Sequence, residues 1–150
     1  MDPSPTLPER TDIVVVGGGV MGTSSAFFLA SDTDRSVTLI EKDSIAAGST
    51  GDSSAILRHH YGGQSIYTEM AWWSHDFYRS FEARTGQPLV HADAPLVRFG
   101  QDGTITGQYV EDGYEILSGR DIPVSRYDHD QLPDRYPMFA GLDRYDFAVS

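Results

Sequence analysis

A glycine-rich turn between two apolar segments constrains the fold more than any other feature. Residues 17–22 read GGGVMG, which matches the pattern G-x-G-x-x-G, and the β-branched run DIVVV at 12–16 precedes them. The small and then bulky residues of 20–31 predict a helix, and SVTLI at 36–40 predicts a second strand. A strand, glycine turn, helix and strand within about 30 residues predict a right-handed βαβ unit. We expect its first strand to be buried and parallel to the second.

The residues of this turn predict a dinucleotide site. Gly17 permits the tight turn, Gly19 lets a pyrophosphate approach the backbone, and Gly22 lets helix and strand pack closely. Val20 and Met21 begin the helix, whose free amides and positive dipole end would face the phosphates. The turn therefore predicts an α/β, Rossmann-like start to the chain.

The acid and the loop after the second strand help to identify the dinucleotide. Glu41 follows Gly22 by 19 residues, where a carboxylate can accept hydrogen bonds from a ribose and would repel the 2′-phosphate of NADP. A nicotinamide-binding domain usually continues with another helix and strand at this point, whereas residues 48–54 of this chain read GSTGDSS. A loop of small hydroxyl residues suits the extended FAD molecule. An NAD-dependent dehydrogenase and a non-catalytic nucleotide-binding module stay open as alternatives.

These segments together resemble the D-amino-acid oxidase/glycine oxidase superfamily of FAD-dependent oxidoreductases, in its sarcosine oxidase and dimethylglycine dehydrogenase branch. The resemblance is carried by VVVGGGVMG at 14–22, LIEK at 39–42 and GSTGDSSAILRHHY at 48–61. It implies oxidation of the C–N bond of a small amine or amino acid. In that reaction a hydride passes from carbon to the flavin, and water hydrolyses the resulting imine.

The resemblance also implies cofactor-binding residues. The positions that match family members around the ADP moiety are Gly17, Gly19, Gly22, Glu41 and Lys42. The positions that match the loop beside the ribityl chain and isoalloxazine are Thr50, Gly51, Ser53 and Ser54.

Two further residues are candidates for the substrate side of the site. Arg58 matches an arginine that binds the substrate carboxylate in sarcosine-oxidase-like members, and a guanidinium suits this bidentate contact. The alternative is a structural arginine paired with an acid. His59 is a candidate polar group near the flavin, although histidines of such loops, His60 included, are more commonly surface residues. No metal is expected, because adjacent histidines point apart and no third ligand is evident.

The remaining sequence predicts a long helix and then short strands. The helix would begin at Ser65 and stop at Gly86, with an apolar stripe that we expect to be core. That stripe consists of Ile66, Met70, Trp73, Phe77 and Phe81. Beyond it we expect strands at 89–91, 96–99, 104–105 and 145–150 and a helix at 109–117.

This pattern suggests three regions. They are a flexible tail at 1–10, an FAD-binding part at 11–87 and the start of a β-rich (α+β) substrate domain at 88–150. Because full family members are much longer, we expect an incomplete chain whose remainder is a missing C-terminal half or a complementary subunit.

The excess of acidic residues limits the classes of binding partner and indicates the salt conditions in which the protein works. The net charge is −11, and Lys42 is the only lysine. So acidic a chain should repel nucleic acid and anionic membranes. Abundant Asp with scarce lysine favours a protein of a salt-loving organism, with an acidic mesophilic protein as the alternative. No apolar run is long enough for a membrane span, and no signal peptide is evident, so we expect a cytoplasmic protein.

Overall fold

The computed structural model describes residues 7–89 and 94–150, and the chain divides into two compact units, residues 1–56 and 57–150. This division differs from the expected boundary between residues 87 and 88. Helix α2 (Ser65–Arg79) contacts α4 (Ile105–Ser118), and Arg120 forms an ion pair with Glu69 of α2. These contacts place α2 with the residues that follow it.

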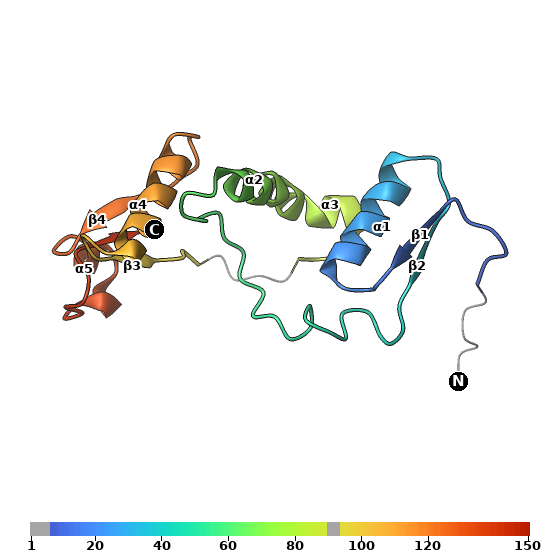
Figure 1. The fold of residues 1–150 in the computed structure, drawn as a ribbon, viewed down its shortest axis with the longest axis horizontal. Coiled ribbons are helices and arrows are strands. Elements are labelled where there is room, and N and C mark those ends of the chain that lie inside the picture. The colour runs from blue at the N-terminus through green and yellow to red at the C-terminus, as the bar shows by residue number, and fades with distance from the viewer. Residues whose placement is uncertain (1–6, 90–93) are drawn as a thin grey trace. The chain divides into compact units, whose positions relative to one another are not determined.

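The first unit contains the predicted βαβ arrangement. Strand β1 (Ile13–Val16) pairs in parallel with β2 (Val37–Ile40), and α1 (Val20–Asp32) connects them and packs against both (Figure 1). The Gly17 amide donates to the Ile40 carbonyl at 2.8 Å, so the turn begins where the strand pairing ends. The predicted α/β unit with parallel strands is confirmed.

The prediction that the first strand is buried was wrong for one face. The Val14 and Val16 side chains are 51% and 82% exposed. Successive strand residues point to opposite faces, and α1 covers only the face that carries Ile13 and Val15. A β-branched run therefore predicted the strand but not what covers it.

The second unit begins with two consecutive helices. Helix α2 is followed by α3 (Phe81–Thr85), which ends at Gly86 in the left-handed conformation, with φ 70°. This confirms the predicted stop at Gly86.

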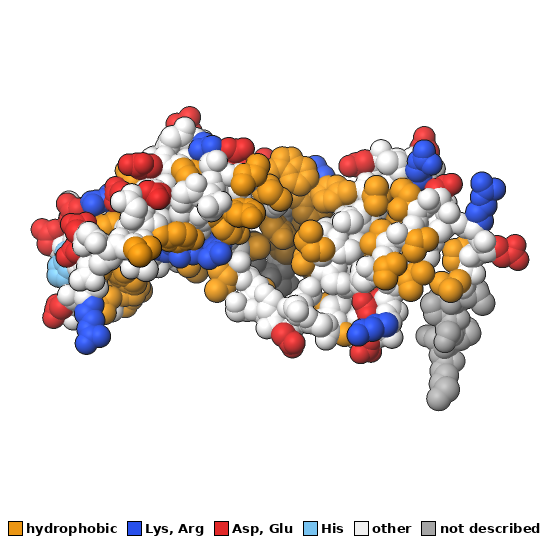
Figure 2. Space-filling view, in the orientation of Figure 1, with side chains coloured by type: hydrophobic (Ala, Val, Ile, Leu, Met, Phe, Trp, Pro, Cys, Tyr) orange, Lys and Arg blue, Asp and Glu red, His pale blue; other side chains and the backbone are white. Residues whose placement is uncertain are grey.

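The expected core stripe of this helix is largely exposed. Ile66, Met70 and Trp73 are all more than half exposed, and Figure 2 shows hydrophobic side chains gathered over α2. Thr68, on the opposite face of α2, is instead fully buried. The prediction that the stripe is core was wrong for these three residues, because α2 turns its other face to the interior of this unit.

The rest of the second unit is an α+β arrangement, but its described residues are not β-rich as expected, because the three strands have 3 residues each and α4 alone has 14. Strands β3 (Arg98–Gly100), β4 (Arg126–Asp128) and β5 (Phe147–Val149) form an antiparallel sheet in the order β3-β5-β4. One core cluster joins Phe147 and Val149 to Val110 of α4. The other joins Ala148 to a segment containing α5 (Leu132–Arg135) and the 3-10 helix η1 (Pro137–Phe139). The alternating residues of β5 thus serve both cores.

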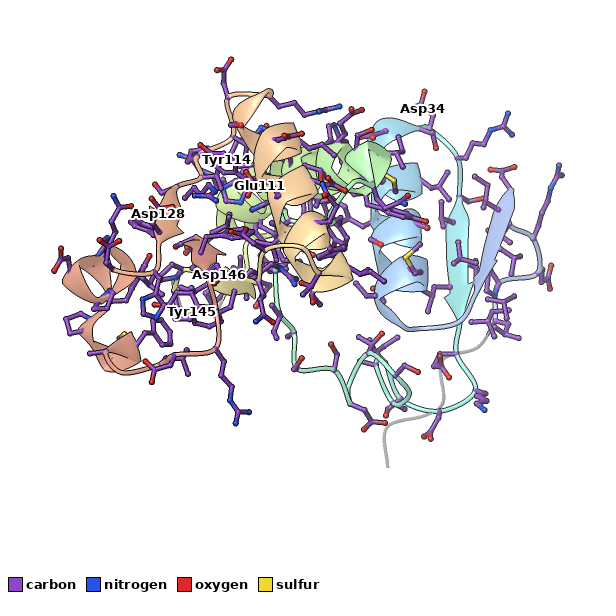
Figure 3. All side chains as sticks on the ribbon, turned by 60° about the vertical axis from the view of Figure 1, so that its left-hand side comes forward. Asp34, Glu111, Tyr114, Asp128, Tyr145 and Asp146 are labelled. Carbon is purple, nitrogen blue, oxygen red and sulfur yellow. The ribbon has the colours of Figure 1, made fainter. Side chains whose placement is uncertain are left out.

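Arg126 of β4 connects this sheet to α4 through an ion pair. Arg126 donates to Glu111 of α4 at 3.1 Å and to Asp128 of its own strand at 2.6 Å; Figure 3 labels both acids. All three side chains are partly exposed, so solvent weakens the pairs. Partly exposed pairs of this kind contribute little to stability.

The predicted short elements had mixed outcomes. The helix expected at 109–117 lies within α4, and the strands expected at 96–99 and 145–150 overlap β3 and β5. The strand expected at 104–105 was wrong, because Thr104 accepts a hydrogen bond from the Gly107 amide at 3.0 Å and caps α4. Of the strand expected at 89–91, residues 90 and 91 lie outside the described residues, as do residues 1–6 of the tail. Within residues 7–89 and 94–150, no helix is both long and apolar enough to cross a membrane.

Candidate functional site

The glycine turn lies between the end of β1 and the start of α1. Gly17 has φ 108°, a left-handed conformation that favours glycine. A Cβ on Gly22 would lie only 1.8 Å from the Gly17 carbonyl oxygen, so helix and turn approach too closely for any side chain. Both positions require glycine for reasons visible in the backbone.

The first turn of α1 presents backbone amides. The Val20 amide donates to the Thr50 hydroxyl at 2.9 Å. The amides of Met21 and Gly22 have no acceptor among the described residues. Free amides at the positive end of a 13-residue helix are donors suited to an anion. Thr50 belongs to the loop that follows β2, so this loop contacts the start of α1.

Glu41 connects the end of β2 to the turn. One carboxylate oxygen accepts the Gly18 amide at 2.5 Å, and the other accepts the Asp43 amide at 3.0 Å. These two hydrogen bonds, the one from Gly18 first, lower the pKa of Glu41. The carboxylate is therefore ionised at neutral pH. Each oxygen retains a lone pair that can accept a hydroxyl hydrogen.

The loop after Glu41 is tied to the turn through its backbone. The Ala46 amide donates to the Gly18 carbonyl at 2.9 Å, and a Cβ on Gly51 would lie 2.4 Å from the Ala46 carbonyl oxygen. Sequence reasoning missed Ala46, because a backbone amide leaves no trace in the residue type. The side chains of Ser53, Ser54 and Lys42 are exposed.

These features fit the ADP half of a dinucleotide. The structure brings together the glycine turn, the start of α1, Glu41 and Thr50. A Cβ on Gly19 would lie 3.0 Å from the Thr50 hydroxyl, so a larger side chain there would fill the space beside the amides. The arrangement offers donors for a diphosphate and an anionic acceptor for a ribose.

Arg58 and His59 belong to the second unit. The Arg58 guanidinium lies 4.6 Å from the centre of the Tyr61 ring. No acid lies within 4.0 Å of Arg58 among the described residues, so the ion pair considered for a structural arginine is not found there.

His59 packs against the rings of Trp72 and His75, at centroid distances of 5.2 and 5.0 Å. Burial, and then the charge of His75, lower the pKa of His59. Among the residues that the structure describes, no three His, Asp or Glu side chains gather as metal ligands.

His60 differs from the surface histidine expected at this position. It is only 5% exposed, and its Nε2 lies 3.0 Å from the Val110 carbonyl oxygen of α4. The sequence feature that could have indicated this burial was Gly113, a glycine within a predicted helix. The His60 ring packs against Gly113.

Comparisons with known proteins agree with this geometry. The family of FAD dependent oxidoreductases (DAO) matches residues 12–149. The mitochondrial pyruvate dehydrogenase phosphatase regulatory subunit of Mus musculus is 37% identical over 83 residues, 53% of this chain and 9% of that protein. The N-methyl-L-tryptophan oxidase of Yersinia pestis (strain Pestoides F) is 26% identical over 136 residues, 89% of this chain and 35% of that protein.

A solved structure shows the same fold. The glycine oxidase from Geobacillus kaustophilus superposes with a TM-score of 0.73 at 20% identity, over 93% of this chain and 38% of that chain. The chain therefore spans well under half the length of each of these three proteins.

Proposed function

The chain belongs to the DAO family of FAD dependent oxidoreductases, and from this we propose that it is the FAD-binding N-terminal portion of an enzyme that oxidises the C–N bond of a small amine or amino acid. The observation that carries the proposal is the open first turn of α1 beside Glu41 and Thr50. Bound FAD would supply the two-electron oxidation, and the protein would orient the substrate. The NAD alternative finds no support, because the matched family is FAD dependent.

The first unit would hold the ADP half of FAD. The amides of Met21 and Gly22 would donate to the pyrophosphate, and Gly19 would let it approach. Glu41 would accept from the adenosine ribose. Lys42, which is exposed, is also proposed to lie beside the ADP moiety. The residues proposed to lie beside the ribityl chain and the isoalloxazine are Thr50, Gly51, Ser53 and Ser54.

The proposed substrate is a small amino acid. N-methyl-L-tryptophan oxidase and glycine oxidase are both named for amino acids. In this chain Arg58 would bind the carboxylate: its guanidinium contacts the Tyr61 ring and forms no ion pair with an acid among the described residues, so its N–H groups could donate two parallel hydrogen bonds to a carboxylate. His59 is proposed as a polar group near the flavin.

A non-catalytic role is the second candidate. The similarity to a phosphatase regulatory subunit favours it, because that protein is named for regulation rather than for oxidation. In this case the FAD site would remain, without turnover of any amine.

We further propose that this is one portion of a longer flavoprotein that works at high salt in the cytoplasm, with its C-terminal half or a complementary subunit completing the substrate site. The net charge of −11 with a single lysine supports the salt adaptation. The chain covers only 35% of N-methyl-L-tryptophan oxidase and 38% of glycine oxidase, and this supports the proposal that it is part of a longer protein.

The test is the turnover of the complete flavoprotein with sarcosine, dimethylglycine, glycine and D-amino acids. Arg58→Ala should raise the KM for the best of these substrates by one to two orders of magnitude, about 1–3 kcal/mol. Arg79→Ala is the matched control, because Arg79 is also exposed and forms no ion pair among the described residues. An unchanged KM for Arg58→Ala would remove Arg58 from the site. A flavin-loaded protein with no turnover would favour the regulatory role.

A further inference from the structure

His60 lies two residues after Arg58 and uses both of its ring nitrogens inside the protein. Nε2 lies 3.0 Å from the Val110 carbonyl oxygen, and Nδ1 lies 3.4 Å from the Gly62 amide. A carbonyl oxygen only accepts and an amide only donates, so Nε2 carries the hydrogen and Nδ1 accepts. His60 is therefore held neutral and in one tautomer.

Helix α4 provides a site for the His60 ring. A Cβ on Gly113 would lie 2.3 Å from His60 Nε2, so only glycine leaves room for the ring. The Tyr109 ring lies 5.4 Å from the His60 ring, and Tyr109 also contacts Gly62, where a Cβ would lie 2.3 Å from it. Gly62 has φ 57°. Residues 60–62 are thus fixed against α4 by one hydrogen bond, from His60 to Val110, and by close packing at Gly62 and Gly113.

The fixed segment carries Arg58. Tyr61, whose ring the Arg58 guanidinium contacts, lies between His60 and Gly62. Burial is the main cause that lowers the pKa of His60, and the charges of Arg98 and Arg58 lower it further. A neutral ring at this place adds no charge beside the arginine.

We propose that His60 is a positioning residue for Arg58: by fixing residues 60–62 on α4, it holds the Tyr61 ring and the Arg58 guanidinium in the orientation that binds the substrate carboxylate. The inference rests on the proposed function, in which Arg58 makes that contact. Protein groups engage both ring nitrogens of His60, so it acts through Tyr61 and Arg58.

A double-mutant cycle on the complete flavoprotein tests this proposal. The KM and kcat of wild type, Arg58→Ala, His60→Ala and the double variant are measured with the best substrate among sarcosine, dimethylglycine, glycine and D-alanine. His60→Ala should raise KM by about tenfold with kcat changed less than about twofold. In the Arg58→Ala background it should raise KM no further. His60→Gln, whose side-chain amide can donate to the Val110 carbonyl, should recover most of the wild-type KM.

The outcomes separate this inference from the proposed function. Equal increases in KM with and without Arg58, or an unchanged KM in His60→Ala, would overturn the positioning role and leave Arg58 in the site. An unchanged KM in Arg58→Ala would overturn both. If His60→Ala does not fold, nitrogen-15 NMR of wild-type His60 decides: a hydrogen on Nε2 and a bare Nδ1 are expected, and the opposite tautomer would overturn the inference.

Discussion

Gly22→Ala should destabilise the first unit through a single backbone contact. The new Cβ would lie 1.8 Å from the Gly17 carbonyl oxygen, whereas such contacts are essentially never shorter than 3.0 Å, so turn and helix must separate by about 1.2 Å (3.0 minus 1.8). The obstructing atom is backbone and cannot rotate away. Overpacking of this kind costs about 1–3 kcal/mol, and replacing glycine by alanine in a helix regains up to about 1 kcal/mol. Taking the middle of the first range, we expect a net loss of about 1–2 kcal/mol in the free energy of unfolding.

Urea unfolding followed by circular dichroism, in concentrated KCl, measures this loss. Gly48→Ala is the matched control, because a Cβ there meets no atom within 4 Å. The control should unfold at the wild-type urea midpoint, and Gly22→Ala at a clearly lower one. If the two variants share a midpoint, the close approach of helix and turn is not what makes glycine necessary.

Three further predictions concern the cofactor site and its setting. Gly19→Val should abolish FAD retention, because its side chain would fill the space beside Thr50 and the α1 amides; a flavin-retaining variant would refute the pyrophosphate assignment. The hydrogen bond from the Gly18 amide is the largest cause that lowers the pKa of Glu41. The ionised Glu41 carboxylate therefore contributes stability above pH 4.5, and this stability is lost as the pH falls through the lower pKa of the folded state. Glu41→Gln should therefore lose less stability than wild type between neutral pH and pH 3, and parallel curves would contradict this. Finally, raising KCl from about 0.1 M to 1 M shortens the screening length from about 10 to 3 Å, which should raise the Tm of a chain with net charge −11; an unchanged Tm would argue against salt adaptation.

The glycine turn was predictable because each constraint on it is local. Gly17 needs its positive φ and Gly22 its missing Cβ whatever surrounds the unit. Thr104 shows the limit of local reasoning by residue type, since a β-branched residue suggested a strand where its hydroxyl caps a helix. A threonine shortly before the start of the helical pattern was the available sign of that cap.

Features that depend on distant residues could not be predicted. The spacing of Ile66, Met70 and Trp73 correctly placed them on one helix face, but periodicity does not say what covers a face. The burial of His60 depends on Gly113, 53 positions away, and on the Val110 carbonyl. Such pairings are set by how α4 packs and leave no local pattern.

The central claim is that the turn at residues 17–22 binds FAD. The most direct measurement titrates the 150-residue chain in concentrated KCl with FAD and separately with NAD, recording flavin absorbance and the heat of binding. We predict saturable FAD binding with a perturbed flavin spectrum, loss of that binding in Gly19→Val, and no binding of NAD. A folded chain that binds NAD in preference to FAD would contradict the account.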